Sequence, residues 1–466
     1  MKINPSIFRE YDVRGIAGKD LSAEFARELG LAYAKMIKEE LPLNEDSPYQ
    51  VSVGRDCRLS GEEYASALVD GLRAGGIDVI TLGVCPTPLT YFSVFHHNFD
   101  GGIMVTGSHN PMEYNGFKIG IGKSTIHGSQ IQRLREIMEG GPTPSNSQGN
   151  LREIEIIPEY IEYVHHHAKK TKPLKVVLDA GNGTAATVAP PLFKALGAEV
   201  IELYCTLDGR FPNHHPDPTV PENLKDLIAK VTETKADFGV AFDGDSDRIG
   251  LVAENGQILY GDEIMVILSR EILKEHPGAT VISEVKSSRR LYEDISKNGG
   301  NPIMWKTGHS LIKSKMKETK ALLAGEMSGH IFFADRFFGF DDAVYAATRI
   351  FEILSHTDKT LSQLIEDLPP VVNTPEIRVD CEEEKKFALV EETKARLKET
   401  EYQINDIDGV RVDFGDSWGL VRASNTQPVL VLRFEAPTEN RLNEVRKIVE
   451  SALTQGAQAI GHGPLL

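Results

Sequence analysis

The fold is decided by residues 49–81, which read YQVSVGRDCRLSGEEYASALVDGLRAGGIDVIT. The first apolar run predicts a strand, and a polar turn follows it. A helix is expected next, opened by a capping box of Ser60 with Glu63 and ended by Gly75-Gly76. A second strand over 77–81 completes a strand–helix–strand (βαβ) unit, whose two strands pair in parallel.

The same order of features occurs twice more, at 175–203 and at 280–305. Each copy adds another strand that ends in a polar loop, and these strands are expected at 102–106, 238–242 and 321–324. Ligands of open α/β sheets bind at the carboxyl ends of the strands. The three loops are therefore expected to face one shared cleft.

After Pro369-Pro370 the order changes, because strands come first and a helix from about 438 to 453 comes last. A loose tail is expected from Gly456. The predicted fold is α/β, with three similar mixed α/β domains of repeated βαβ type and a smaller C-terminal α+β domain around one central cleft. The predicted domains are 1–152 (serine loop), 153–256 (acidic loop), 257–368 (with the polar loop 325–330) and 369–466 (with the polar loop 422–426).

Composition excludes several classes of protein. The 466 residues are 41% hydrophobic and carry a net charge of −17, which is ordinary for a globular chain but gives no electrostatic basis for binding duplex nucleic acid or an anionic membrane. No apolar run approaches the roughly 18 residues of a membrane span, and the first residues lack the apolar core of a signal peptide. The four cysteines lie far apart without a C-x-x-C motif, which favours a cytoplasmic location.

Asp243, Asp245 and Asp247 stand at alternate positions directly after a hydrophobic strand. Carboxylates this close repel one another by about 1 to 4 kcal/mol per pair, and a bound cation relieves the repulsion. Oxygen ligands with positions left open for a phosphate favour Mg²⁺. The alternative is a solvated acidic turn. An EF-hand is excluded because Arg248 occupies the position that requires glycine.

Ser108 lies in the loop Thr106-Gly-Ser-His-Asn-Pro111, where glycine and Asn-Pro favour a sharp turn. It is a candidate nucleophile or phosphoryl carrier, and a merely solvated loop serine is the alternative. His109 suggests a Ser-His pair, but adjacent residues seldom align base and nucleophile. A phosphoserine would add acceptor oxygens and a charge near −2, suited to a metal held by the aspartates.

Two further loops carry polar groups. The loop 422–426 offers a guanidinium, hydroxyls and an amide that suit a phosphate, with an ordinary polar hairpin as the alternative. The loop 325–330 offers a carboxylate, a hydroxyl and an imidazole that suit sugar hydroxyls. Gly122-Lys-Ser124 imitates the end of a Walker A loop, but Phe117 replaces its first glycine. His165–His167 is interpreted as a solvated helix surface, since consecutive helical positions face different ways.

Together these motifs resemble the α-D-phosphohexomutase superfamily, and most closely its bacterial phosphomannomutase/phosphoglucomutase branch. The resemblance covers essentially the whole chain and rests on six motifs in order. These are Phe8–Gly15, Thr106–Pro111, Asn115–Lys118, Asp243–Arg248, Gly325–His330 and Arg422–Thr426.

The resemblance implies roles for individual residues. Ser108 is expected to be a phosphoserine that coordinates Mg²⁺ together with Asp243, Asp245 and Asp247. Lys118, Arg248 and His309 are expected to act in acid/base catalysis and to balance charge at the site of phosphoryl transfer. Contacts to the sugar hydroxyls are expected from Glu326 and Ser328, with His330 closing that loop. The substrate phosphate is expected to bind at Arg422, Ser424, Asn425 and Thr426, with further substrate contacts from Tyr11, Arg14 and Lys286.

The implied reaction interconverts hexose 1-phosphate and hexose 6-phosphate, of mannose and/or glucose, through a hexose 1,6-bisphosphate that is both intermediate and activator. The expected partners are small-molecule hexose phosphates, and the expected assembly is a monomer or small homo-oligomer. A phosphoglucosamine mutase is an alternative, although Met327 fits the mannose/glucose branch. A metal-dependent phosphomonoesterase and a non-catalytic sugar-phosphate sensor are alternatives of a different class.

Overall fold

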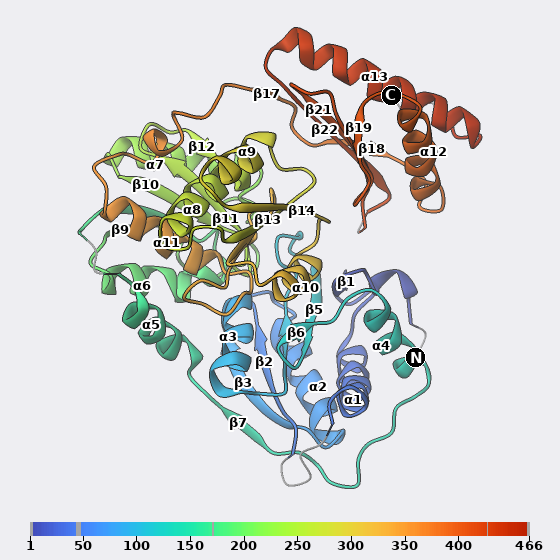
Figure 1. The fold of residues 1–466 in the computed structure, drawn as a ribbon. Helices are drawn as coiled ribbons and strands as arrows, with labels where there is room; N and C mark the ends of the chain where they lie inside the picture. The colour runs from blue at the N-terminus through green and yellow to red at the C-terminus, as the bar shows by residue number, and fades with distance from the viewer. Residues whose placement is uncertain (1–2, 43–47, 170–171, 426, 464–466) are drawn as a thin grey trace.

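The computed structural model describes residues 3–42, 48–169, 172–425 and 427–463. Three α/β units lie against one another, and a fourth unit is attached at the edge of the third (Figure 1). Each unit is built on its own sheet. This arrangement confirms the predicted fold class. The predicted domain boundaries stay predictions, and the first of them falls within the short strand β7 (Leu151–Glu153).

The first sheet has a parallel part and an antiparallel part. Its parallel strands are β4 (Gly101–Val105), β2 (Gln50–Arg55), β3 (Asp78–Val84) and β7, in that order. Strand β5 (Tyr114–Ile121) runs antiparallel to β4, and β1 (Val13–Ile16) and β6 (Ser124–Thr125) pair with β5. The helices of this unit are α1 (Ala23–Glu40), α2 (Gly61–Ala74), α3 (Thr87–His97) and α4 (Ser129–Glu139).

The second and third sheets repeat this plan. In the second, β8 (Lys175–Asp179) lies parallel between β9 (Glu199–Leu203) and β10 (Phe238–Phe242), followed by antiparallel β11 (Ile249–Ala253) and β12 (Ile258–Leu259). In the third, β13 (Thr280–Glu284) lies between β14 (Asn301–Trp305) and β15 (Leu323–Gly325), and β16 (Ile331–Phe333) is antiparallel to β15. Their helices are α5 (Ile156–His167), α6 (Ala189–Ala195), α7 (Lys225–Thr234), α8 (Gly261–Glu275), α9 (Arg289–Lys297), α10 (His309–Thr319) and α11 (Ala343–Ser355).

Each of the three polar loops stands at the same place in its sheet. It follows the parallel strand that borders the antiparallel part of the sheet and precedes an antiparallel strand, at β4–β5, β10–β11 and β15–β16. The pairing partners at the base of the second loop are Phe242 and Ile249, and those of the third are Gly325 and Ile331. Because the three sheets share one plan, one end of each sheet carries the loop with the functional residues.

The fourth unit is an antiparallel sheet with two helices, α12 (Lys386–Lys398) and α13 (Glu439–Ala459). The expected loose tail from Gly456 is wrong up to Ala459, because α13 continues through this glycine, where an added Cβ would lie 3.2 Å from Oγ1 of Thr393 on α12. The missing side chain lets the two helices pack closely. The strands are β17 (Val372–Asn373), β18 (Ile377–Asp380), β19 (Gln403–Asn405), β20 (Val410–Asp413), β21 (Trp418–Ala423) and β22 (Val429–Ala436).

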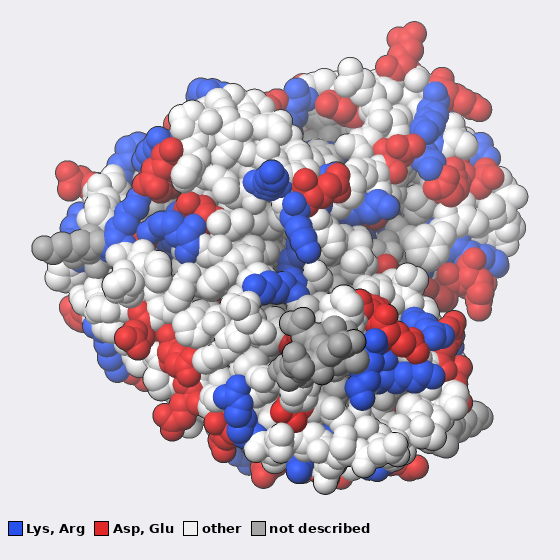
Figure 2. Space-filling model, turned by 60° about the horizontal axis from the view of Figure 1, so that its bottom comes forward, with Lys and Arg blue, Asp and Glu red and all other residues white. Residues whose placement is uncertain are grey.

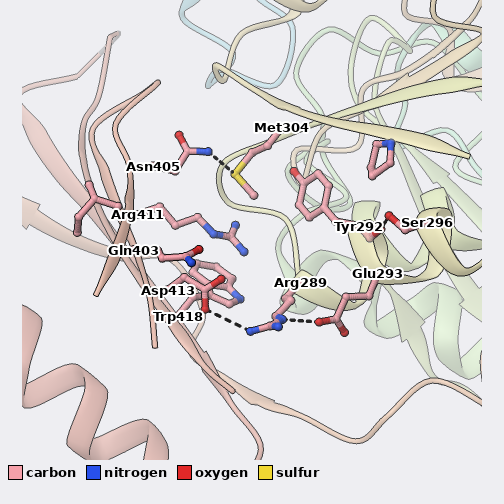
Figure 3. Close-up of a pocket in the computed structure, with 12 residues that line it drawn as sticks. Arg289, Tyr292, Glu293, Ser296, Met304, Gln403, Asn405, Arg411, Asp413 and Trp418 are labelled. Carbon is pink, nitrogen blue, oxygen red and sulfur yellow. Dashed lines mark hydrogen bonds and ion pairs between the residues drawn. The ribbon is translucent and has the colours of Figure 1, made fainter. Parts of the chain in front are cut away.

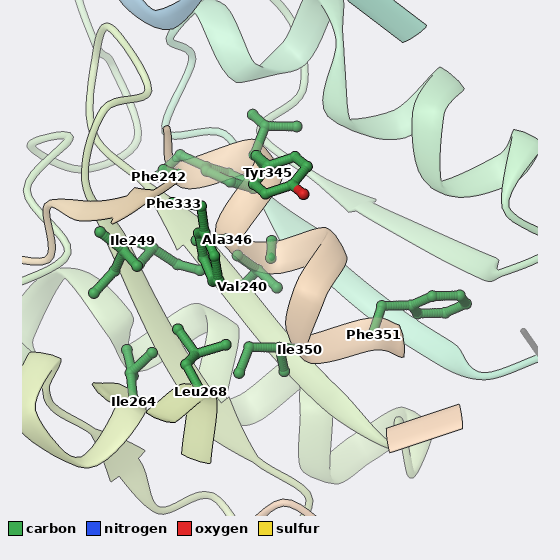
Figure 4. Packing of buried hydrophobic residues seen from close by; sticks show 14 of the residues in the cluster. Val240, Phe242, Ile249, Ile264, Leu268, Phe333, Tyr345, Ala346, Ile350 and Phe351 are labelled. Carbon is green, nitrogen blue, oxygen red and sulfur yellow. The ribbon is translucent and has the colours of Figure 1, made fainter. Parts of the chain in front are cut away.

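One large hydrophobic core joins the first three units. Helix α11 packs between the second and third sheets, where Ile350 lies near Val240, Ile249 and Phe333 (Figure 4). The fourth unit has a separate core of its own. The first three units therefore form one packed body, to which the fourth is joined by a smaller contact.

That smaller contact surrounds a cavity of about 550 Å³ (Figure 3). The guanidinium of Arg411 stacks on Trp418, with 3.7 Å between its Cζ and the ring centroid. It also donates hydrogen bonds to the carbonyl oxygens of Val285 and Ser287, the latter at 2.8 Å. These two residues flank Lys286, so the joint between the third and fourth units also positions Lys286.

The predicted capping box at the start of α2 is wrong. The Ser60 hydroxyl makes no capping hydrogen bond to the helix. Its Oγ instead accepts a hydrogen bond from Nδ2 of Asn115, at 2.9 Å. A tertiary contact with β5 therefore uses the oxygen that local sequence assigns to the helix.

The surface carries both signs of charge. Lys and Arg are mixed with Asp and Glu over the face in Figure 2. Among the helices of the described residues, none combines the length and the apolar character that a membrane span needs.

Asp342 makes the stability of this fold depend on pH. Burial raises its pKa from 3.8 to about 7, although it accepts hydrogen bonds from Tyr345 N–H (2.8 Å) and Tyr160 Oη (2.8 Å). The folded state then binds the proton more tightly than the unfolded state, so stability falls as pH rises from about 4 to about 7, by at most about 1.4 kcal/mol per pH unit. We expect Asp342→Asn, which has no proton to lose, to flatten this dependence in thermal unfolding curves. An unchanged pH profile would contradict the prediction.

Candidate active site

Ser108 lies where the first and second units meet. Its backbone adopts the left-handed conformation, with φ +47°, and its side chain is buried. Oγ donates a hydrogen bond to Oδ2 of Asp243 at 3.0 Å, and the backbone N–H donates to Oγ1 of Thr106 at 2.8 Å. The structure therefore brings together the serine and the acidic loop that the sequence places 135 residues apart.

Arg58 and Asp56 hold the serine loop in place. Oδ2 of Asp56 accepts hydrogen bonds from Arg58 Nε (3.2 Å), Thr106 Oγ1 (2.8 Å) and Gly107 N–H (3.1 Å). The Arg58 side chain is fully buried. Its remaining donors reach the carbonyl oxygens of Ser108 (2.8 Å), Asn110 (2.5 Å), Pro111 (2.6 Å) and Tyr114 (2.9 Å).

Sequence analysis missed this ion pair. Both residues lie after β2, at the carboxyl end of a parallel strand, which is the position that marks the other functional loops. The sequence pattern predicts only a polar turn before a helix here. Its position at the end of a parallel strand was the signal that could have identified it.

The three aspartates form a buried cluster in which ligand atoms lie within 4.8 Å of one another. Oδ1 of Asp243 accepts the backbone N–H groups of Asp247 and Arg248, each at 3.1 Å. Oδ2 of Asp245 accepts Thr87 Oγ1 at 2.5 Å and Lys118 Nζ at 2.7 Å. Lys118 also forms an ion pair with Asp247.

This cluster fits a divalent cation. Its donors are carboxylate oxygens, which Mg²⁺ prefers. Oδ1 of Asp245 is buried and has no hydrogen-bond partner among the residues described. Buried polar atoms normally have a partner, so this oxygen is available as a ligand.

The surroundings of the cluster shift the pKa values of Asp243 and Asp247 in opposite directions. Burial, together with the nearby Asp245 and Asp247, raises the pKa of Asp243 well above its usual range. Burial works against ionisation of Asp247 too, but Lys118 and His330 outweigh it and lower the pKa of Asp247 well below its usual range. Burial alone would lower the pKa of Lys118, and the aspartates raise it instead. Lys118 is therefore an ammonium ion among carboxylates.

His330 connects the acidic loop with the loop of the third unit. Its Nδ1 lies 3.0 Å from Oε2 of Glu326 and 2.9 Å from Oγ of Ser328, and its Nε2 lies 3.3 Å from Oδ1 of Asp247. Burial opposes the charged ring, but Asp247 and Glu326 raise the pKa of His330 to about 9. At neutral pH the ring is charged and bridges two carboxylates.

The backbone also joins these two loops. The N–H of Ile249 donates to the carbonyl oxygen of Gly329 at 3.0 Å. Gly329 has φ +88°, and an added Cβ would lie 2.4 Å from the oxygen of Ile249. Only glycine allows this close approach.

His309 begins α10 and faces two other rings of the site. Its ring centroid lies 5.6 Å from that of Tyr11 and 5.6 Å from that of His330. Burial lowers the pKa of His309 well below 6.5, so its ring is neutral. Nδ1 has no hydrogen-bond partner among the described residues and lies 3.7 Å from Oδ2 of Asp341. A neutral ring can accept a proton.

Tyr11 brings three units together. Its hydroxyl donates to the carbonyl oxygen of Thr307 at 2.9 Å and accepts a hydrogen bond from Nδ2 of Asn425 at 3.0 Å. Asn425 belongs to the fourth loop. All four loops therefore lie around one site.

Three more residues that are predicted to contact the substrate form hydrogen bonds within the protein, namely Arg422, Ser424 and Lys286. Nε of Arg422 donates to Asp408 Oδ2 at 3.1 Å, and Ser424 Oγ accepts Gln427 N–H at 3.2 Å. Nζ of Lys286 donates to Glu376 Oε1 at 2.7 Å. Thr426 lies outside the described residues.

Arg14 is tied to the serine loop. Its Nη1 donates to the carbonyl oxygen of Gly107 and to Oδ1 of Asn110, each at 2.7 Å. It also forms an ion pair with Asp12. The guanidinium thus holds the loop that carries Ser108.

His109 is closer to Ser108 than expected. Its Nδ1 lies 3.1 Å from Oγ of Ser108, because the left-handed turn at the serine folds the ring back. Burial lowers its pKa well below 6.5. Within the described part of the chain, no carboxylate is hydrogen-bonded to this ring, so the third member of a hydrolase triad is missing.

The two motifs set aside in the sequence are structural. Gly122 and Lys123 form the turn between β5 and β6, and the next helix begins only at Ser129. His165–His167 are exposed at the end of α5. Neither motif contributes to the site.

Comparison with known proteins agrees with this geometry. Family models described as phosphoglucomutase/phosphomannomutase alpha/beta/alpha domains I, II and III match residues 5–143, 158–256 and 260–372, and the C-terminal domain model of the same family matches 376–452. A Pseudomonas aeruginosa phosphomannomutase/phosphoglucomutase is 48% identical over 96% of this chain and 95% of its own length. A Neisseria gonorrhoeae phosphoglucomutase is 44% identical over 96% of this chain and 98% of its own length. A Burkholderia thailandensis phosphoglucomutase/phosphomannomutase family structure has a TM-score of 0.91 at 44% identity and covers 98% of both chains.

Arg58→Lys tests the ion pair that holds the serine loop. Lysine cannot reach four carbonyl oxygens, and a buried acceptor left without a donor costs about 1–3 kcal/mol. We expect amide hydrogen exchange over residues 107–114 to become at least about tenfold faster, since tenfold corresponds to about 1.4 kcal/mol. Arg210→Lys, at an exposed arginine paired with Asp208, is the matched control and should change nothing in this segment. Equal exchange in both variants would contradict the role of Arg58.

Proposed function

This chain belongs to the phosphoglucomutase/phosphomannomutase family and interconverts hexose 1-phosphates and hexose 6-phosphates, and we propose that Ser108 carries the transferred phosphoryl group. The observation that supports this role is the hydrogen bond between Ser108 Oγ and Asp243 Oδ2. It places a buried hydroxyl beside a carboxylate cluster that is itself paired with Lys118. A phosphoryl group on Oγ would lie next to both.

In the proposed reaction, phosphorylated Ser108 gives its phosphoryl group to the free hydroxyl of a hexose monophosphate. The Oγ–phosphorus bond breaks and leaves Oγ as an oxyanion, a bond from phosphorus to the sugar oxygen forms, and the hydroxyl proton passes to His309. We assign this proton to Nε2, because Nδ1 faces Asp341. The resulting hexose 1,6-bisphosphate turns end for end, and its other phosphate returns to Oγ as His309 gives the proton back.

Cationic side chains near the serine are proposed to neutralise the negative charge of the phosphoryl group. Phosphoryl transfer depends mainly on positioning and on neutralising charge on the phosphoryl oxygens. Lys118 and Arg248 are proposed for this role, since Lys118 lies within the cluster and Arg248 follows it directly. Arg14 keeps the loop in its turn through Gly107.

Asp243, Asp245 and Asp247, with the phosphate on Ser108, are proposed to hold Mg²⁺. When bound, this ion supplies positive charge that polarises the phosphoryl group. The carboxylate cluster and the unpartnered Oδ1 of Asp245 support the assignment.

The substrate is proposed to bind between the third and fourth loops. Arg422, Ser424, Asn425 and Thr426 would hold the phosphate that is not reacting, with Lys286 and Tyr11 beside it. Glu326 and Ser328 would bind the C3 and C4 hydroxyls in either orientation of the sugar, with His330 fixing Glu326 through their 3.0 Å contact. We propose mannose and glucose phosphates as substrates, the 1,6-bisphosphate as activator, and the cytoplasm as the compartment, in keeping with four free thiols.

Ser108→Ala tests the phosphoryl carrier. Without Oγ no phosphoenzyme can form, so we expect the rate of glucose 1-phosphate conversion to fall at least about a thousandfold. Binding of glucose 6-phosphate, measured by calorimetry, should change only a few-fold because the phosphate-binding loop is intact. Ser451→Ala, an exposed serine on α13, is the control and should keep full turnover.

Several outcomes would reject this proposal. Near-normal turnover of Ser108→Ala would remove the phosphoserine role. Release of inorganic phosphate without hexose 6-phosphate would favour a phosphomonoesterase, and faster conversion of glucosamine 1-phosphate than of mannose or glucose 1-phosphate would favour a phosphoglucosamine mutase. Absence of turnover with tight sugar-phosphate binding in the unaltered chain would favour a sensor.

Mg²⁺ binding can be tested without turnover. A ligand that binds only the folded state at a hundred times its Kd stabilises it by about 2.7 kcal/mol. We expect Mg²⁺ to raise the unfolding temperature of the unaltered chain and of Asp358→Asn, an exposed control, but not of Asp245→Ala. The same Mg²⁺ shift in Asp245→Ala would place the ion elsewhere.

A further inference from the structure

A second cavity, of about 700 Å³, lies between the first and third units. One wall comes from α3 and the turn between β5 and β6, and the other comes from α10 and residues 334–340. These elements lie next to one another near the middle of Figure 1. None of the residues proposed above for catalysis, metal binding or substrate binding lines this cavity. Its volume falls in the range of small-molecule sites, about 300–1,000 Å³.

The lining combines apolar rings with charge of one sign. Aromatic and aliphatic side chains form most of it, including Tyr91, Val94, Phe95, Met316, Phe338 and Phe340. Its charged residues are all lysines, namely Lys123, Lys313, Lys317 and Lys320. No aspartate or glutamate is among the lining residues described, although the chain carries 68 acidic and 51 basic residues. Apolar walls with several lysines complement a ligand that has an apolar body and a negative group.

Lys313 is the least exposed of these four lysines, and it has an acidic partner. Its side chain is 13% exposed, and Nζ lies 4.3 Å from the centroid of the Tyr91 ring. Nζ also donates to Oδ1 of Asp341 at 3.0 Å. An ammonium group has three donors, so Lys313 can bind an anion and keep Asp341.

We propose that this cavity binds an amphipathic anion: an apolar chain or ring that carries one carboxylate, sulfonate or phosphate group. The anionic group pairs with Lys313, and the lysines at 317 and 320 add to its attraction. The apolar body packs against Phe95, Phe338 and Phe340. Because its two walls belong to different units, the bound ligand holds the first and third units together.

The cavity is linked to the proposed active site through Asp341. One carboxylate oxygen, Oδ1, accepts a hydrogen bond from Lys313. The other, Oδ2, lies 3.7 Å from Nδ1 of His309, and in the part of the chain that the structure describes neither of these two atoms has a hydrogen-bond partner. Buried polar atoms without partners are uncommon. An anion on Lys313 shares the positive charge that Asp341 otherwise has alone, so Oδ2 of Asp341 can turn toward Nδ1 of His309 and fix the ring while Oδ1 keeps its contact with Lys313. This effect on turnover rests on the proposed role of His309, whereas the binding does not.

Binding is tested on the full chain without substrate, using the fluorescence of 1-anilinonaphthalene-8-sulfonate, an aromatic sulfonate. We expect one saturable site per chain, from which octanoate and phenyl phosphate displace the dye. Octyl glucoside, which lacks charge, and inorganic phosphate, which lacks an apolar body, should displace it at least tenfold less well.

Variants assign the site. Ser314→Trp places a large ring in the cavity from an exposed position, and Lys313→Met removes the anchoring charge; each should weaken dye binding at least tenfold. Lys317→Glu reverses a charge at an exposed position and should weaken it at least threefold. Lys225→Glu, an exposed lysine on α7 in the second unit, is the matched control and should bind as the unaltered chain does.

The outcomes separate the two parts of the inference. Dye binding that survives Ser314→Trp and Lys313→Met within twofold, or octyl glucoside and octanoate competing equally, overturns the site. Loss of binding in those variants, together with an octanoate-dependent change in kcat and in its pH profile that both variants abolish, supports site and link. Loss of binding with no octanoate effect on kcat supports the site and overturns the link to His309. Because the dye assay uses no substrate, its result does not depend on whether Ser108 is the phosphoryl carrier.

Discussion

The structure depends on keeping three carboxylates buried together at Asp243, Asp245 and Asp247. Such a cluster is unstable without nearby positive charge and hydrogen-bond donors, because burial and mutual repulsion both oppose ionisation. The protein supplies them from different units: the first contributes Lys118 and Thr87, and the third contributes His330. The buried carboxylates are therefore compensated only when the first and third units are packed against the second, which also assembles the cleft.

The repeated βαβ plan explains how such distant segments meet. Each of the first three units ends a parallel strand in a loop that leads into an antiparallel strand, and the common core around α11 fixes the sheets relative to one another. Direct contacts then join the loops, such as the hydrogen bond from Ile249 N–H to the carbonyl oxygen of Gly329. One packed body carries three of the four loops, and Tyr11 contacts the fourth through Asn425.

Much of this could be predicted from the sequence, because strand ends and polar loops are local features. Asp243 and its neighbours are visible as alternating carboxylates after a strand, and the order of the motifs indicates the family. The contacts that position them are not local. Arg58 acts on carbonyl oxygens up to 56 residues away, and backbone carbonyls leave no mark in a sequence. Ser60 was assigned to a helix cap on a valid local rule, but Asn115 competes for the same oxygen.

The joint at Arg411 has a mechanical consequence. Its guanidinium holds the carbonyl oxygens on both sides of Lys286, while Arg422 lies in the same fourth-unit sheet. The backbone at Lys286 is thereby tied to the sheet that carries Arg422, so any displacement of this sheet would act on both residues. The two cations that we propose to bind the substrate are therefore mechanically coupled, and release of a sugar phosphate would involve both of them at once.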